Sequence, residues 1–270
     1  MSGTPNWMLQ AGTYPPWVVA HRGASEACPE NTLAAIRAAA AMPGVRAIEF
    51  DVQLSRDEVV VVAHDETLER LNGDVRAIRD LTWDELQQVD AGSWKNPAFA
   101  GERIPRLEEV LESVDGPALF IEIKVHPADR EAGRHYRLGE CVLQCLAGWQ
   151  GECAILSFDR DVLFRISTLD AEAALVLNAD DPTVVDGWRG IGGKSELNTI
   201  SSICATIDMD VMLLSEFIAG PIHAAGFALL TFTCNDEERL SRALAAGVNG
   251  IISDRPDWLA AKIEDRTSLS

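Results

Sequence analysis

Several apolar segments of this chain end in residues whose side chains could bind a metal ion or transfer protons. The run Val18–Ala20 is followed at once by His21, Arg22 and Gly23. Similar endings recur later, so the candidate site residues are His21, Arg22, Glu49, Asp51, His64, Glu122 and Lys124. Short apolar runs of this kind are typical of buried strands, and parallel strands present functional groups at their C-terminal ends.

Two kinds of chemistry suit these residue types. Three carboxylates, Glu49, Asp51 and Glu122, are the oxygen ligands that Mg²⁺ and Ca²⁺ prefer. Two histidines, His21 and His64, suit a general acid–base pair, because an unperturbed histidine pKa of about 6.5 allows both roles near neutral pH. We therefore predict one divalent cation, Mg²⁺ or Ca²⁺, beside an acid–base pair.

The charge balance narrows the class of substrate. The net charge of −19 disfavours binding to nucleic acids or to anionic membranes, which need basic surfaces. An anionic substrate must then be attracted by local cations, and Arg22 and Lys124 can neutralise a phosphoryl group. We expect a small-molecule substrate and no nucleic-acid partner.

Each residue also has an ordinary structural interpretation. Glu49 and Asp51 could form the solvated face of an edge strand, a lone histidine could be a hydrogen-bonded core residue, and Glu122 could pair with Lys124 on the surface. Their recurrence at the ends of apolar strands favours the catalytic interpretation. The remaining histidines, His126, His135 and His223, have no such context and are expected to be structural or exposed.

A hairpin is predicted to bring the first groups together. Residues 47–54 alternate strictly, so that Glu49 and Asp51 share one face. The apolar run 59–63 follows too soon for a parallel crossover connection. We predict a β-hairpin over 47–64 with Arg56 and Asp57 at its tip. Position 49 would then lie opposite His64, on the face shared with Asp51.

Strands and helices alternate along the rest of the chain. Further strands are predicted at 118–124, 154–158, 173–178, 211–214, 228–233 and 250–253. Helices are predicted at 29–42, 82–89, 107–114, 129–149, 161–169, 195–204, 215–225 and 237–246, with a loop at 180–193 and a frayed tail after Lys262. This alternation favours a TIM-type (β/α)8 barrel over a doubly wound sheet. We expect one domain over residues 1–270, with a small insertion at about 65–106.

Composition gives the expected environment. The six cysteines have no zinc-ligand or disulfide-scaffold spacing, and Cys141 and Cys145 would be neighbours on one helix face. The N-terminal residues lack the pattern of a signal peptide, and no apolar run reaches the roughly 20 residues that span a bilayer. The prediction is a cytoplasmic protein without stable membrane insertion; homo-oligomerisation is left open.

Read together, the motifs resemble the glycerophosphodiester phosphodiesterase family. The segments that carry the resemblance are HRGASEACPENTLAAI (21–36), IEFDVQLSRDEVVVVAHDETLERL (48–71), AGERIPRLEEVL (100–111), FIEIK (120–124), LSFD (156–159), TFTCND (231–236) and GIISDRPD (250–257). The resemblance runs from Val18 to Trp258. Each motif alone is common, but their combination in this order is specific.

The resemblance implies roles for the candidate residues. His21 and His64 would be the acid–base pair, Glu49, Asp51 and Glu122 the ligands of a divalent cation, and Arg22 and Lys124 the phosphate contacts. The family's reaction, part of glycerol and lipid metabolism, splits a glycerophosphodiester into sn-glycerol 3-phosphate and an alcohol. The neighbouring glycerol hydroxyl would attack phosphorus, so no protein nucleophile is needed.

Three positions depart from the family pattern. Glu58 stands where glycine is common, Arg106 where threonine is frequent, and Phe232 where tryptophan is frequent, in the apolar wall beside the substrate. These departures bear on substrate preference rather than on activity.

Two other functions fit the same residues less closely. One is a lysophospholipase D or phospholipase-D-like enzyme acting on lipids, for which the Trp94–Phe99 loop is the candidate apolar lid. The other is a non-catalytic phosphodiester-binding barrel, which the complete set of histidines and carboxylates disfavours.

Overall fold

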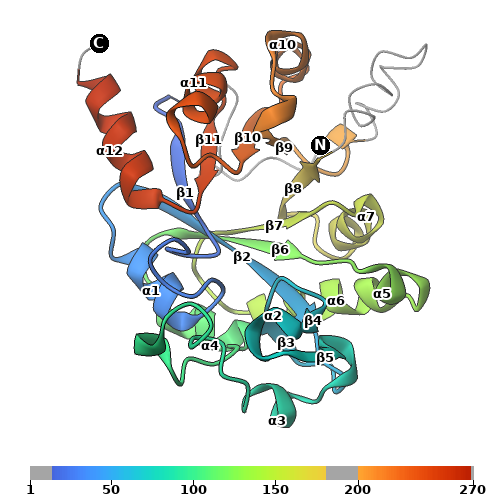
Figure 1. Cartoon of the computed structure of the whole chain (residues 1–270). Helices are drawn as coiled ribbons and strands as arrows, with labels where there is room; N and C mark the ends of the chain where they lie inside the picture. Colours follow the sequence, from blue (N-terminus) through green and yellow to red (C-terminus); the bar gives the residue numbers. More distant parts are fainter. Residues whose placement is uncertain (1–13, 181–199, 269–270) are drawn as a thin grey trace.

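Eight parallel strands close into a barrel in the computed structural model, which describes residues 14–180 and 200–268 (Figure 1). The barrel strands are β1 (Trp17–His21), β2 (Val45–Leu54), β6 (Ala118–Ile123), β7 (Cys153–Ser157), β8 (Ala174–Ala179), β9 (Thr206–Asp210), β10 (Ala228–Phe232) and β11 (Gly250–Ser253). Strand β1 pairs with β11 on one side and with β2 on the other, so the sheet has no free edge on this circuit. The predicted TIM-type barrel is confirmed.

The strand residues that point into the barrel form layers. The layer nearest the N-terminal ends of the strands consists mostly of small residues. Larger apolar residues fill the next layer, in the middle of the barrel. This interior cluster consists of Val19, Ala47, Ala118, Phe120, Ala154, Leu156, Ala174, Val176, Ala228, Leu230 and Ile252. Because side chains alternate along a strand, the next inward positions toward the C-terminal ends are occupied by His21, Glu49, Glu122, Asn178 and Asp208. The sequence therefore places an apolar floor beneath a polar mouth.

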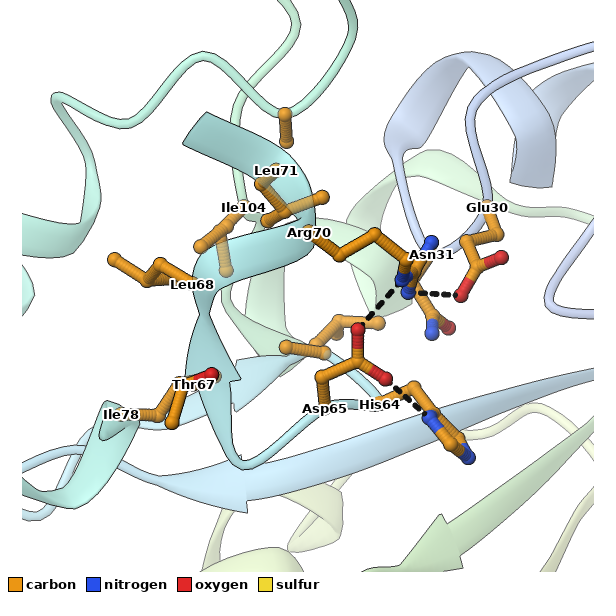
Figure 2. A pocket seen from close by; sticks show the side chains of 13 residues that line it. Glu30, Asn31, His64, Asp65, Thr67, Leu68, Arg70, Leu71, Ile78 and Ile104 are labelled. Carbon is orange, nitrogen blue, oxygen red and sulfur yellow. Dashed lines mark hydrogen bonds and ion pairs between the residues drawn. The ribbon is translucent and has the colours of Figure 1, made fainter. Parts of the chain in front are cut away.

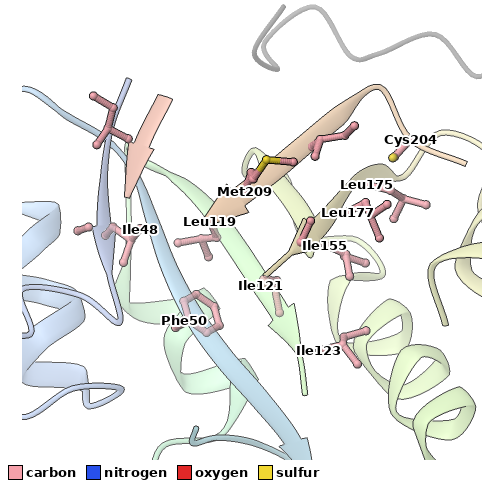
Figure 3. Packing of buried hydrophobic residues seen from close by; sticks show 14 of the residues in the cluster. Ile48, Phe50, Leu119, Ile121, Ile123, Ile155, Leu175, Leu177, Cys204 and Met209 are labelled. Atoms are coloured by element: carbon pink, nitrogen blue, oxygen red, sulfur yellow. The ribbon is translucent and has the colours of Figure 1, made fainter. Parts of the chain in front are cut away.

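The opposite faces of the strands pack against the surrounding helices. Figure 3 shows Ile48, Leu119, Ile121 and Leu175 in this outer layer of the core. The surrounding helices are α1 (Leu33–Ala40), α4 (Leu107–Ser113), α5 (Pro127–Glu131), α6 (Arg134–Leu146), α7 (Arg160–Leu169), α10 (Glu216–Ala224), α11 (Glu237–Ala245) and α12 (Pro256–Thr267). Because both faces of each strand are buried, the strand sequences are nearly continuous apolar runs.

The predicted hairpin is present, with a register that differs by one residue. Strand β3 (Val60–Val62) runs antiparallel to β2, and Val52 pairs with Val62. The tip has three residues rather than two, ending at Glu58, whose φ of 63° is left-handed. A glycine adopts this conformation more easily, which explains the family's usual residue there. Continued in this register, the ladder would put residue 50, not 49, opposite His64.

The insertion follows the hairpin and lies beside β2 (Figure 1). Its elements are β4 (Thr67–Leu68), α2 (Glu69–Asn72), β5 (Asp74–Ala77), a 3-10 turn (Ile78–Asp80), α3 (Trp83–Leu86) and a second 3-10 turn (Pro97–Phe99). Helix α3 begins with a capping box, because Thr82 accepts from the Glu85 amide and the Glu85 carboxylate accepts from the Thr82 amide. A separate apolar cluster around Leu81 and Leu86 packs this segment.

Some predicted boundaries were wrong. The strand expected at 211–214 is a 3-10 turn (Val211–Leu213), and β9 lies just before it. The helix expected over 129–149 is divided into α5 and α6 at Gly133, which is left-handed with a φ of 70°.

The predictions for the first helix and for the C-terminal tail also need correction. Helix α1 begins at Leu33 with Thr32 as its N-cap, so residues 29–31 belong to the preceding turn. The expected tail is helical through Thr267, because α12 packs Leu259 and Ile263 against the barrel. Residues 181–193 of the expected loop and residues 195–199 of the helix expected at 195–204 lie outside the described residues.

Candidate active site

A cavity of about 350 Å³ opens at the C-terminal ends of the barrel strands. It is lined by His21, Arg22, Glu49, His64, Glu122, Lys124, Leu156, Phe158, Asn178, Asp180, Asp208, Phe232, Thr233 and Ile252. Counting Phe232 with the seven candidate residues, seven of the eight site residues predicted from the sequence are in this lining. The eighth, Asp51, is fully buried directly behind it, within 3.2 Å of Arg22 and 3.0 Å of Lys124.

Three carboxylates meet at one side of the cavity. Glu49, Asp51 and Glu122 are all buried and offer ligand atoms within 4.8 Å of one another. The alternation in β2 points Glu49 and Asp51 the same way, and Asp51 pairs with Glu122 in the parallel register of β2 and β6. Two neighbouring strands therefore hold the three ligands on a rigid frame.

One buried oxygen of the triad has neither a hydrogen bond nor an ion pair with any described residue. Glu49 Oε2 accepts the Arg22 backbone N–H at 3.0 Å. Its other oxygen, Oε1, is buried and accepts no hydrogen bond from any described residue. A buried carboxylate oxygen left in this state is costly unless a cation or another donor occupies the space beside it.

Burial and mutual repulsion set the protonation of the triad. Burial and the negative charges of Asp51 and Glu122 raise the pKa of Glu49 well above its usual range. Burial likewise raises the pKa of Glu122 to about 7, against the attraction of Lys124. For Asp51, burial is outweighed by the Lys124 and Arg22 charges, which hold its pKa far below the usual value.

Two cations border the triad. Lys124 Nζ lies 3.0 Å from Asp51 Oδ1 and 2.6 Å from Glu122 Oε1. Arg22 is placed by a left-handed turn, with a φ of 55°, and its Nε lies 3.2 Å from Asp51 Oδ2. The next residue, Gly23, is also left-handed, and a Cβ there would lie 2.5 Å from the Ala35 carbonyl carbon. Only glycine fits this turn.

His21 is oriented by a carboxylate from the far end of the chain. Its Nδ1 lies 2.6 Å from Asp254 Oδ1, and Asp254 also accepts from Ser25 Oγ and Asn235 Nδ2. Burial opposes ionisation of Asp254, but the bond to His21 and these two donors lower its pKa to about 2. His21 Nε2 is left facing the cavity, 3.9 Å from Glu49 Oε2.

His64 reaches the same cavity by a different route. The chain leaves β3 after Val62, and the Gln53 side-chain amide donates to the carbonyls of Ala63 and Asp65. This turn directs His64 into the cavity although strand register alone would not. The predicted convergence of Glu49 and His64 is therefore found, with a different cause. Burial, followed by the charges of nearby Lys124 and Arg22, lowers the pKa of His64.

The insertion connects His64 with Arg22. Figure 2 shows Asp65 between His64 and Arg70, and Arg70 between Asp65 and Glu30. His64 Nδ1 lies 2.8 Å from Asp65 Oδ1, while Arg70 donates to Asp65 Oδ2 at 2.6 Å and to Glu30 Oε1 at 2.8 Å. The same Glu30 oxygen accepts from Arg22 Nη1 at 2.8 Å. The guanidinium of Arg70 also stacks over Trp94.

An aromatic wall closes one side of the mouth. Phe232 at the end of β10 meets Phe158, which follows β7, in an edge-to-face contact with ring centroids 5.9 Å apart. Phe232 therefore lies beside the cavity, as expected for the position where the family often has tryptophan. Lys124 Nζ lies 6.0 Å from the Phe158 ring centroid, near the limit of a cation–π contact.

Several residues of the site were missed from the sequence. They are Glu30, Asn31, Gln53, Asp65, Arg70, Asn178, Asp208, Asn235 and Asp254. Asp65 and Asp254 follow apolar strands and could have been noticed by the rule that found His21. Asp208 belongs to the alternating run Thr206-Ile-Asp-Met-Asp210, which was hidden because the strand was predicted five residues too late.

The remaining histidines do not line the cavity. His135 is buried in α6, and His223 Nε2 contacts the Ala246 carbonyl at 3.2 Å. Among the described residues the cysteines are free, and Cys141 and Cys145 share α6 as predicted. No helix in the described ranges is long and apolar enough to cross a membrane.

The Trp94–Phe99 loop does not form an apolar lid. Trp94 donates from its indole to the Ala91 carbonyl, and Lys95 Nζ donates to the Ser25 carbonyl at 2.9 Å. This loop is fastened to the barrel by polar contacts. Exposed apolar side chains instead follow barrel strands at Phe158, Met212 and Phe217.

The comparison with known proteins decides the family. Residues 21–258 match the model of the glycerophosphoryl diester phosphodiesterase family. This chain belongs to that family. As a glycerophosphoryl diester phosphodiesterase family member it is a phosphoric diester hydrolase, which confirms the predicted enzyme class.

Known members of the family align with nearly the whole length of this chain. A glycerophosphodiester phosphodiesterase of Caldanaerobacter subterraneus is 31% identical over 252 residues, covering 90% of this chain and 95% of the relative. Another from Bacillus altitudinis is 31% identical over 254 residues, covering 92% and 98%. The solved structure of an Oleispira antarctica phosphodiesterase, in complex with its product sn-glycerol-3-phosphate, superposes with a TM-score of 0.81 at 28% identity, covering 93% of this chain and 97% of that one.

Proposed function

We propose that this protein hydrolyses glycerophosphodiesters to sn-glycerol 3-phosphate and an alcohol, with His21 and His64 as the acid–base pair. The observation that carries the proposal is that both histidines, each paired through Nδ1 with a carboxylate, line the cavity of the carboxylate triad. Family membership and the product bound to the Oleispira antarctica relative support the substrate class.

The donor set fits a divalent cation held by Glu49, Asp51 and Glu122. Among the described residues, Arg22 and Lys124 are the cations that contact the three carboxylates, so the fully ionised triad has one negative charge in excess even before an anionic diester enters. The unpartnered Glu49 Oε1 indicates where a further positive charge is needed. A bound Mg²⁺ or Ca²⁺ would supply Lewis-acid polarisation of the phosphoryl group.

The side chains of the chain itself can carry the proton transfers. Asp254 and Asp65 bind the Nδ1 atoms of His21 and His64, which leaves each Nε2 free for the substrate. One histidine removes the proton from the glycerol hydroxyl next to the phosphate as that oxygen attacks phosphorus. The other protonates the leaving alcohol. Water then opens the cyclic phosphate with the two roles reversed.

Arg22 and Lys124 would bind the non-bridging phosphate oxygens. Their placement beside Asp51 and Glu122 keeps both side chains ordered and charged, because the buried carboxylates raise the pKa of each cation against the effect of burial. Such pre-oriented charges favour the pentavalent transition state, which has more negative charge on these oxygens than the diester does.

The direct test is turnover of a panel of diesters by the purified protein after chelation and after readdition of Mg²⁺, Ca²⁺ or Mn²⁺. We expect glycerol 3-phosphate to be released from glycerophosphocholine or a related diester only with metal present. Glu49→Gln should weaken metal binding and lower activity together. No turnover of any diester with any of these metals would overturn the proposal. Faster cleavage of lysophosphatidylcholine than of water-soluble diesters would favour the lipid-directed alternative.

A further inference from the structure

Two polar residues on the cavity wall formed by β8 and β9 have no role in the proposed reaction. Asn178 on β8 and Asp208 on β9 are partners in the parallel register of these strands, and both line the cavity. Around the barrel, β9 is four strands from β2 in either direction and β8 is four strands from β1. Asn178 and Asp208 therefore lie across the barrel from His21 and from the two triad residues on β2, whereas Glu122 on β6 is two strands from β8.

Both side chains have buried oxygens that lack partners. Asp208 is 1% exposed and Asn178 is 4% exposed. The Oδ1 atom of each accepts no hydrogen bond from the described part of the chain. Buried polar groups in proteins are nearly always hydrogen-bonded, so two unpaired acceptors side by side in one cavity call for donors from a bound molecule.

The chemistry of this wall excludes some ligands. Asp208 does not belong to the carboxylate cluster whose atoms are close enough to share a cation. Neither Asn178 nor Asp208 carries a positive charge, so a phosphate group is held better by Arg22 and Lys124. A neutral hydroxyl remains, since it donates to one oxygen and fits against apolar neighbours such as Leu156 and Ile252.

The depth of the wall identifies which end of the substrate lies there. Asp208 is deeply buried and pairs with Leu230 of the apolar floor, whereas Phe158 at the mouth is 41% exposed. The alcohol leaves first and must reach solvent, which suits the mouth. The glycerol part stays attached to phosphate. We propose that Asn178 and Asp208 bind the free terminal hydroxyl of the glycerol moiety, and so select glycerophosphodiesters over diesters that lack it. This inference rests on the function proposed above.

The test compares two substrates that differ by one hydroxyl. Glycerophosphocholine has the terminal hydroxyl, and 2-hydroxypropyl phosphocholine lacks it but keeps the hydroxyl that attacks phosphorus. A buried site that hydrogen-bonds a substrate hydroxyl rejects the analogue without it, so we expect the wild type to prefer glycerophosphocholine by about tenfold or more in kcat/KM. Asp208→Ala and Asn178→Ala should each reduce this preference to about threefold or less, because they remove the acceptors.

Further variants separate binding from folding. Asp208→Asn keeps the shape of the side chain and should retain an intermediate preference. Thr206→Val is the matched control, since Thr206 is buried on the same strand with an unpaired hydroxyl but does not line the cavity. This variant should leave the ratio between the two substrates unchanged.

The outcomes are distinct. A wild type without preference, or a preference that survives in the Asp208 and Asn178 variants, would overturn the inference while diester hydrolysis stands. A changed choice between choline and ethanolamine diesters, with the hydroxyl preference intact, would assign this wall to the leaving alcohol and also overturn it. Failure of the wild type to cleave any diester would instead refute the proposed function.

Discussion

The two histidines of the cavity are held in place by different parts of the fold. His21 belongs to β1, and its partner Asp254 follows β11, which is the neighbouring barrel strand. His64 follows the antiparallel hairpin, and its partner Asp65 is the next residue in the chain. The side chain of His21 is 17% exposed and that of His64 is 33% exposed.

This difference separates a rigid half of the site from an adjustable one. The His21–Asp254 contact joins residues 233 apart in sequence and exists only when the barrel is closed. The His64–Asp65 contact depends on the turn after β3 and on Arg70 from the insertion. Changes in the insertion could therefore alter His64 and Arg22 without disturbing the barrel, whereas any change at Asp254 acts on a contact made by barrel closure.

The largest effects are expected from the histidines themselves. His21→Ala and His64→Ala should each lower kcat by about 10²–10⁴-fold, the usual contribution of a general acid or base. A glycerophosphodiester with a p-nitrophenol leaving group needs little protonation, so the first step, release of p-nitrophenol, should recover much of its rate in the variant that lacks the first-step acid but not in the one that lacks the first-step base. Steady-state assays with both substrates test this.

His223→Ala is the control for these substitutions, because His223 lies on α10 and contacts the Ala246 carbonyl away from the cavity. Full activity in either cavity variant would contradict the assigned pair. Equal losses with both leaving groups in both variants would contradict the division of roles.

The same contrast explains what could be predicted from the sequence. The barrel and the charged strand ends were predictable, because period-two alternation and apolar runs report burial directly. The hydrogen-bond partners of the site residues were harder to predict. Asp254 orients His21 through strand pairing that closes the barrel, and local pattern carries no information about which strand becomes the neighbour.

The hairpin shows a second limit. The existence of the hairpin followed from the short gap between the strands. Its register depended on the left-handed conformation of Glu58, which few non-glycine residues adopt. His64 was placed correctly only because the Gln53 side chain turns the chain after β3. Tertiary hydrogen bonds of this kind override the register that alternation predicts.

Smaller effects should distinguish the two supporting carboxylates. Asp254→Asn and Asp65→Asn should each lower kcat by about 10–100-fold, since each removes the charge of the carboxylate that orients an imidazole and adds an amide N–H that can favour the wrong tautomer. The pKa of Asp254 is lowered from 3.8 to about 2 in the folded protein, so its ionised form stabilises the fold above pH 4 and this contribution is lost as the pH falls toward 2. Asp65 also has a lowered pKa.

Urea denaturation at pH 6 and at pH 3, without divalent cations, measures this contribution. The difference in unfolding free energy between wild type and Asp254→Asn should be larger at pH 6 than at pH 3. We expect the same sign but a smaller change for Asp65→Asn. A loss of stability that is equal at both pH values would show that the Asp254 charge is not what stabilises this contact.

The smallest effect tests whether the insertion acts on the site through Arg70. Arg70 is half-exposed and bridges Asp65 to Glu30, so Arg70→Ala should lower kcat/KM by roughly twofold to fivefold, in keeping with the 0.2–1 kcal/mol typical of exposed ion pairs. The matched control is Arg76→Ala, because Arg76 also bridges two carboxylates of the insertion, Asp74 and Glu85, but touches nothing in the cavity. That variant should keep full activity.

A double-mutant cycle decides whether the path runs through Asp65. If Arg70 orients His64 by holding Asp65, then Arg70→Ala should cost little in kcat once Asp65→Asn is present, because the contact it supports has already been weakened. The same substitution combined with Glu30→Gln should show coupling in KM instead, since Glu30 contacts Arg22. Additive losses in both cycles, or equal losses in the Arg70 and Arg76 variants, would mean that the insertion stabilises the protein without adjusting His64. The adjustable half of the site would then end at Asp65.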